Sequence, residues 1–138
     1  MPLSILAYLG ALVSMLALDA VWLGLVMPSV YQAALGPLLL PEPRWGAAAL
    51  FYLAYPVGVV VFAVLPAWRA RAPRQGWGLG ALYGALAYAT YDLTNLATLR
   101  GWPVHIVVVD IAWGAVISAL AAAASLALLQ RRRGSSPR

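Results

Sequence analysis

The sequence has no cysteine, no lysine and very little charge of either sign. Only 9% of its 138 residues are charged and 64% are hydrophobic, against about 25% and roughly 45–50% in soluble globular proteins. So little charge cannot cover the surface of a water-soluble domain, which excludes a soluble enzyme. The absence of cysteine excludes a disulfide-stabilised scaffold, thiol catalysis and thiolate metal sites. An integral membrane protein is the class that remains.

Four apolar runs are each long enough for a transmembrane helix, which needs about 20 mainly apolar residues. They cover about residues 3–27, 46–67, 77–99 and 104–130. Only the tight turn Gly101-Trp102-Pro103 separates the last two, so these helices are expected to be antiparallel neighbours. Pro28 precedes residues 29–35, which are expected to form a short surface helix. The predicted fold is an all-α, four-transmembrane-helix bundle in one domain, residues 1–130, followed by a basic tail, residues 131–138.

All nine basic residues are arginines, and each lies at or beyond the end of an apolar run. Such positions are typical of topology signals and not of a phosphate-binding stripe, so we predict no nucleic-acid partner. Seven of them lie in the second connector and the tail, whereas two, Arg44 and Arg100, lie on the other side. Because arginine accumulates on the cytoplasmic side, both termini are predicted to be cytoplasmic.

Three of the four acidic residues, Asp19, Asp92 and Asp110, lie inside predicted spans. In this topology each lies seven or eight residues from the outer end of its helix, a depth of about 11 Å at 1.5 Å per residue. No basic residue lies at that depth, so repulsion and burial favour a shared proton or a bound cation. Oxygen ligands alone would suit a hard cation such as Mg²⁺, Ca²⁺ or Na⁺. No other cofactor is evident, and the three aspartates would be the ligands of such a cation.

Helical periodicity places aromatic and polar side chains on the same helix faces as the acids. Asp-x-x-Trp occurs twice, and leucines lie opposite Asp92 on its helix. We predict a pocket for a ligand or a proton formed by Asp19, Trp22, Tyr88, Tyr91, Asp92, Asn95, Asp110 and Trp113. Asp92 is the best candidate for a catalytic group. The spacing Gly80-x-x-x-Gly84 on the same face predicts a close approach of a neighbouring helix.

The remaining polar and aromatic residues receive more ordinary interpretations. Arg100 and His105 are the residues nearest the mouth of the predicted pocket. The second helix has no acid and is predicted to form a wall, with a kink at Pro56. Four tryptophans that flank the spans are interpreted as interfacial anchors: Trp45, Trp68, Trp77 and Trp102.

Three motifs resemble one family of small bacterial membrane proteins, grouped as domain of unknown function 2177. They are Asp19-Ala-Val-Trp22-Leu-Gly24, Tyr91-Asp92-Leu-Thr94-Asn95-Leu-Ala-Thr98-Leu-Arg100-Gly101-Trp102-Pro103 and Val109-Asp110-Ile-Ala-Trp113-Gly114. The resemblance extends over about residues 3–128, nearly the whole chain. It implies a bacterial four-helix protein of the cytoplasmic (inner) membrane. It brings no established activity, so no catalytic role is carried over.

Several functions are left open by the sequence. The main interpretation is a polar, acid-lined pocket in the outer half of the bundle that binds a small ligand, a lipid group or a cation. One alternative is an intramembrane enzyme that acts on a lipid or apolar substrate, with Asp92 as general acid or base. Another is a proton- or ion-handling transporter subunit, for which a homo-oligomer is expected because four helices hardly line a full pore. A third is a non-catalytic assembly partner of another membrane protein. Nothing polar continues toward the cytoplasmic half, which favours a blind pocket over a path through the membrane.

Overall fold

The first half of the chain forms a long helix and a short one. The computed structural model describes residues 1–134, with the side chain of Val26 left out. Helix α1 (Leu3–Val21) continues as a π-helical turn, η1 (Trp22–Val26). Helix α2 (Pro28–Leu35) follows and ends in a 3-10 turn, η2 (Gly36–Leu38). The predicted short helix after Pro28 is therefore confirmed.

The second half consists of three long helical stretches. Helix α3 (Trp45–Val59), the π-helical turn η3 (Val60–Val64) and α4 (Leu65–Arg69) follow one another directly. Helix α5 (Pro73–Thr98) and helix α6 (Val104–Gly134) complete the described chain. Pro56, where the kink is predicted, lies within regular helix. The π-helical turn η3 begins four residues later, and Pro66 follows it in the first turn of α4. Residues 131–133 of the predicted tail are helical, whereas residues 135–138 lie outside the described part.

Three helical stretches are long and apolar enough to cross a membrane: Leu3–Leu25, Trp45–Arg69 and Val104–Gly134. They correspond to the first, second and fourth predicted spans. Helix α5 has a sufficient length of 26 residues, but glycines, threonines, Asp92 and Asn95 dilute its apolar residues. Length and composition therefore support an all-helical membrane protein with three candidate spans.

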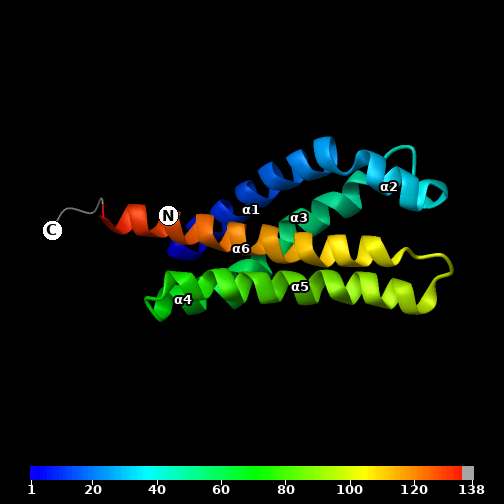
Figure 1. Ribbon diagram of the computed structural model, residues 1–138. Helices are drawn as coiled ribbons and strands as arrows, with labels where there is room; N and C mark the ends of the chain where they lie inside the picture. Colours follow the sequence, from blue (N-terminus) through cyan, green and yellow to red (C-terminus); the bar gives the residue numbers. More distant parts are fainter. Residues whose placement is uncertain (135–138) are drawn as a thin grey trace.

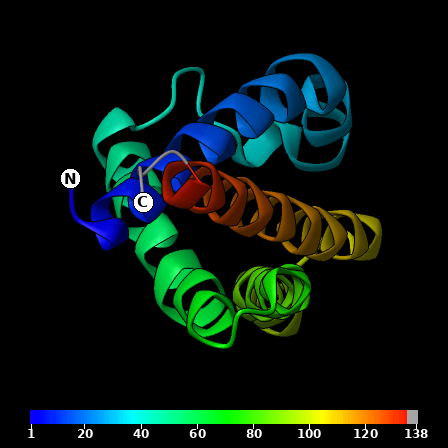
Figure 2. The same cartoon turned by 90° about the vertical axis from the view of Figure 1, so that its left-hand side faces the viewer.

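Helix α6 lies at the centre of the arrangement. Figure 1 shows α5 and α6 side by side and antiparallel, joined by the turn at Gly101, whose φ is +73°. Seen end on, α6 lies between α1 and α5, and the α3–α4 stretch crosses beside them (Figure 2). The α5–α6 turn and α2 lie at one end of the bundle, and α4 and the end of α6 lie at the other.

Glycines allow α5 and α6 to pack with their backbones nearly in contact. A Cβ atom added to Gly84 would lie 1.9 Å from the Gly114 carbonyl oxygen, and one added to Gly80 would lie 2.7 Å from the Ser118 carbonyl oxygen. Both distances are well below any van der Waals contact. The close approach predicted from Gly80-x-x-x-Gly84 is therefore confirmed.

The core between the helices consists of small and medium apolar side chains. Its buried members come from α1, the α3–α4 stretch and α6, and include Ala7, Ala11, Met15, Val59, Ala63, Val64, Ile117, Ala121 and Leu126. Hydrogen bonds also cross between helices. Ser125 Oγ donates to the Ala7 carbonyl oxygen at 2.9 Å, and the Tyr55 hydroxyl lies 2.8 Å from Ser118 Oγ. Large apolar side chains such as Leu50 (69% exposed) and Phe62 (61%) face outward, as expected for a lipid-facing surface.

A second, smaller core fixes α2 against the α5–α6 end of the bundle. It contains Leu35 from α2, Trp102 from the turn and Val107 from α6, with Tyr31 packed against them. Trp102 is only 9% exposed, so its side chain packs inside the protein. Its ring fills the space between α2 and the turn, and this packing determines where Tyr31 lies.

Candidate binding site

Asp19 lies in the last turn of α1 and connects three helices. It is 5% exposed, and each of its carboxylate oxygens accepts one hydrogen bond. The Tyr52 hydroxyl of α3 donates to Oδ2 at 2.7 Å, and the Trp113 indole nitrogen of α6 donates to Oδ1 at 2.8 Å. An indole N–H can only donate, so Oδ1 must act as an acceptor. Two neutral donors thus fix the orientation of the Asp19 carboxyl group.

The two Asp-x-x-Trp motifs lie opposite each other. The rings of Trp22 and Trp113 stack with their centroids 4.2 Å apart and their planes 3° from parallel. Trp22 is the first residue of the π-helical turn η1, and π-helical turns are frequent at functional sites. Because each tryptophan follows its aspartate by three residues, the stacked rings connect the neighbourhoods of Asp19 and Asp110.

Asp110 is contacted by α2, which lies in the connector between α1 and α3. It lies on α6, is 8% exposed, and accepts a hydrogen bond from the Tyr31 hydroxyl of α2. Burial and the neighbouring Asp110 carboxyl raise the pKa of Tyr31 above its usual value near 10. Its phenol therefore stays protonated and keeps donating at neutral pH.

Asp92 is the most deeply buried of the three acids. It is 0% exposed, and neither of its carboxyl oxygens has a hydrogen-bond partner among the described residues. It interacts with the Asp110 carboxyl and lies near the Trp102 indole, whose N–H is likewise buried without a well-formed hydrogen bond. An unpaired buried carboxyl group is costly. Because of this cost, packing alone does not explain why an aspartate occupies position 92.

A small cavity lies between these groups. Its volume is about 180 Å³. Its lining is acidic and aromatic: Asp19, Trp22, Leu23, Tyr31, Phe51, Tyr52, Tyr88, Tyr91, Asp110 and Trp113. A second hollow of about 390 Å³ is lined by Phe51, Tyr55, Ala87, Tyr88 and Tyr91. Because Phe51, Tyr88 and Tyr91 line both, the polar cavity adjoins an apolar groove between α3 and α5.

The structure brings six of the predicted pocket residues to one cavity: Asp19, Trp22, Tyr88, Tyr91, Asp110 and Trp113. Asp92 and Asn95 are not in the lining, because α5 turns Asp92 toward Asp110 and the helix interface. Arg100 and His105, predicted near the mouth, are exposed at the α5–α6 end and are not in the lining either. Within residues 1–134, no three Asp, Glu or His side chains are arranged to hold one metal ion.

Two tyrosines in the lining are absent from the predicted set. Tyr52 lies on a helix without acids, which the sequence presents as a wall, yet its hydroxyl is bound to Asp19. Tyr31 lies in the proline-rich connector, and its contact with Asp110 spans 79 positions of the chain. Helical periodicity within single spans contains no signal for either contact. Both depend on how α2 and α3 fold back against the acid-bearing helices.

Comparison with known proteins identifies one family. Residues 4–127 match the family model described as "Predicted membrane protein (DUF2177)". Among curated proteins and solved structures, no match is found.

Proposed function

Since this chain belongs to the DUF2177 family of predicted membrane proteins, we propose that it binds a small ligand, lipid group or cation in the cavity beside Asp19. Among these ligands, the structure best supports positively charged ones, in particular ammonium compounds. The protein would be a four-span component of the bacterial inner membrane with both termini in the cytoplasm. The cavity would then open in the outer half of the membrane.

The length and packing of helix α5 support the proposal that it is the fourth membrane span. Its 26 residues correspond to about 39 Å at 1.5 Å per residue, which exceeds the apolar thickness of a bilayer of about 30 Å. It runs antiparallel to α6, one of the candidate spans. Three of its four glycines, Gly76, Gly80 and Gly84, are buried, whereas Leu82, Leu86 and Leu93 are 56%, 60% and 51% exposed. Burial of these glycines and of Asp92, together with exposure of the leucines, suits a helix that faces lipid on one side.

The main support for a positively charged ligand is the acidic and aromatic lining of the cavity. Two carboxyl groups, Asp19 and Asp110, border a space otherwise enclosed mainly by aromatic rings, and none of the described lining residues is basic. Hydrogen bonds from neutral tyrosine and tryptophan donors orient the carboxyl groups but leave their charge uncompensated. An ammonium group would supply the opposite charge and gain from the faces of Trp22 and Trp113.

The size of the cavity supports a small group with an apolar extension. About 180 Å³ corresponds to the volume of about six water molecules at roughly 30 Å³ each. An ammonium group with a few carbon atoms would fill it. The adjoining groove is lined by apolar and aromatic side chains, so an attached hydrocarbon chain could pass between α3 and α5 toward the lipid.

The thermal stability of the purified protein in nanodiscs tests this proposal. Choline is the probe, and 3,3-dimethyl-1-butanol, which has its shape without its charge, is the control ligand. Ligand at 100 times its Kd stabilises a protein by about 2.7 kcal/mol. We expect choline to stabilise the wild type and Glu42→Gln, which alters an exposed acid of the connector, but not Asp19→Asn. Equal responses to both ligands, or an unchanged response in Asp19→Asn, would refute the proposal.

The buried Asp92 supports a second candidate, a proton- or ion-handling role. Two neighbouring carboxyl groups, Asp92 and Asp110, can share one proton and pass it between them. Four helices enclose too little space for a pore, so this role would need a homo-oligomer or a membrane partner protein. The enzyme alternative would require Asp92 to act through Asp110, because Asp92 does not line the cavity. Proton flux in liposomes that is lost in Asp92→Asn would support the second candidate over the first.

A further inference from the structure

We propose that a second site, at the opposite end of the bundle from Asp19, binds the phosphate group of an anionic phospholipid. The site lies where α4, the α4–α5 turn and the last turns of α6 meet. Its polar groups are Arg71, Arg133, Gln130 and the Trp68 indole. It shares no residue with the acid-lined cavity, so it stands independently of the function proposed above.

Arg133 and Trp68 form one side of this site. The guanidinium carbon of Arg133 lies 5.9 Å from the centroid of the Trp68 ring, within the range of a cation–π contact. This contact holds the end of α6 against α4. A guanidinium that lies against a ring keeps its N–H edge available for hydrogen bonds to an anion.

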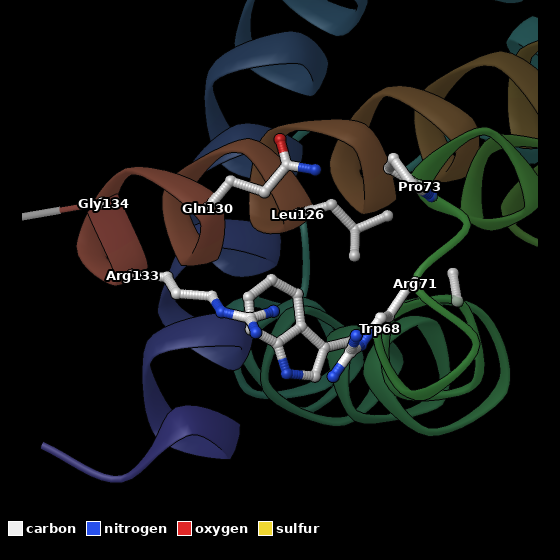
Figure 3. Close-up of a pocket in the computed structure, with 8 residues that line it drawn as sticks. Trp68, Arg71, Pro73, Leu126, Gln130, Arg133 and Gly134 are labelled. Atoms are coloured by element: carbon white, nitrogen blue, oxygen red, sulfur yellow. The ribbon is translucent and has the colours of Figure 1, made fainter.

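Arg71 brings a second guanidinium to the same place. Its φ of +55° turns the chain sharply between α4 and α5, and its backbone N–H donates to the Trp68 carbonyl oxygen at 3.1 Å. In Figure 3 the guanidinium groups of Arg133 and Arg71 both lie near the Trp68 indole, and Gln130, Leu126 and Pro73 lie across from them. Two cations, one from the α4–α5 turn and one from the end of α6, thus border one hollow.

The hollow has the size and lining that a phospholipid head requires. Its volume is about 380 Å³, and its apolar floor comes from Ala67, Pro73 and Leu126. No acid is among its described lining residues, so neither guanidinium is neutralised within the lining. Guanidinium groups bind phosphate through paired N–H···O bonds, and Gln130 could bond the ester or glycerol oxygens.

The position of the hollow favours a lipid over a soluble anion. Two candidate spans, Trp45–Arg69 and Val104–Gly134, both end at it, which places it at the level of the headgroups. Basic pockets between membrane helices on the cytoplasmic side are typical binding places for anionic lipid heads. The apolar floor would lie beneath the glycerol backbone, and the acyl chains would follow the exposed apolar faces of the helices.

Two double variants with the same loss of charge separate this site from a general attraction of basic residues to lipid. Arg71→Gln with Arg133→Gln removes both guanidinium groups of the hollow. Arg74→Gln with Arg131→Gln is the matched control. Arg131 lines a different hollow, beside Leu9 and Val13, and Arg74 is exposed outside the hollow. Circular dichroism and gel filtration would verify that both variants are folded.

The measurement is the amount of phosphatidylglycerol retained by the detergent-purified full chain in native mass spectrometry, with phosphatidylcholine as competitor. We expect the wild type and the control to prefer phosphatidylglycerol about tenfold and the Arg71/Arg133 variant to lose this preference. A parallel titration with inorganic phosphate distinguishes the source of the anion, and we expect no displacement of lipid at millimolar phosphate. Equal preferences in the two double variants, or displacement of lipid by phosphate alone, would overturn the proposal.

Discussion

At the residue scale, the environment of a carboxyl group decides its role. Asp19 has a neutral donor on each oxygen, whereas Asp92, which is buried more deeply, has none. The first is an oriented acceptor that borders a cavity. The second is an unpaired group next to Asp110. Three acids at one depth are therefore not three equivalent ligands.

Removal of a single hydroxyl tests the orientation of Asp19. Tyr52→Phe deletes the donor to Oδ2, and we expect a loss of about 0.6 kcal/mol of stability, typical of hydrogen bonds between membrane helices. Because only Trp113 then orients Asp19, choline binding should weaken by about threefold or more. The measurements are denaturant unfolding and the thermal response to choline.

Tyr8→Phe is the matched control for this change. The Tyr8 hydroxyl also joins α1 to α3, by a hydrogen bond of 2.9 Å to the Leu53 carbonyl oxygen, but it does not line the cavity. Its loss should cost similar stability and leave the response to choline unchanged. If both variants bound choline as the wild type does, the Tyr52–Asp19 hydrogen bond would have no part in recognition.

At the element scale, the contact between α5 and α6 determines where Asp92 and Asp110 meet. Backbone contact at Gly84 and Gly80 brings the two helices together, and the Gly101 turn fixes their antiparallel register. Helix α2 then folds over this end through Trp102 and Leu35. The site is thus assembled by elements that are each simple, and its geometry depends on their mutual approach.

Substitution of glycine on α5 tests this approach. Gly84→Ala would place a Cβ 1.9 Å from the Gly114 carbonyl oxygen, so the helices must separate. We expect a net destabilisation of about 1–3 kcal/mol, the usual cost of overpacking, in thermal unfolding. Gly78→Ala on the same helix meets no atom within 4 Å and should be neutral, or stabilising by up to about 1 kcal/mol. Equal stability of the two variants would contradict the packing described here.

The sequence predicted the elements better than their contacts. Apolar length located the long helices, the Pro28 signal located α2, and the paired glycines predicted the α5–α6 contact. Periodicity also placed Asp19, Trp22 and Trp113 on inward faces. Tyr31 and Tyr52 were missed because tertiary folding of α2 and α3 brings them to the acids. The packing of Trp102 between α2 and the α5–α6 turn was missed for the same reason.

At the scale of the whole molecule, the distribution of charge gives the two ends different chemistry. Acids and aromatic rings gather at the end that contains α2, and arginines gather at the end of α4 and α6. A protein inserted in one direction would therefore present an anionic cavity to the outer leaflet and a cationic hollow to the inner one. Both proposed sites depend on this asymmetry.

Labelling of single introduced cysteines tests the topology. Because the chain has no native cysteine, only the introduced residue can react. Gln75→Cys and Arg100→Cys lie at exposed positions near the two ends of α5. In spheroplasts, an impermeant maleimide should label Arg100→Cys at once and Gln75→Cys only after lysis. Gln32→Cys, exposed on α2, should behave like Arg100→Cys. Labelling of positions 75 and 100 from the same side would show that α5 does not cross the membrane.

The indole N–H resonances of the protein in nanodiscs provide the most direct test of the acid-lined cavity as a cation site. The chain has six tryptophans, and single Trp→Phe variants assign their ¹⁵N–¹H signals. Choline should shift the signals of Trp113, which donates to Asp19, and of the stacked Trp22. It should leave those of Trp45 and Trp77 (66% and 56% exposed) unchanged, and 3,3-dimethyl-1-butanol should shift none. Shifts confined to Trp45 and Trp77, or no shift at saturating choline, would contradict the account.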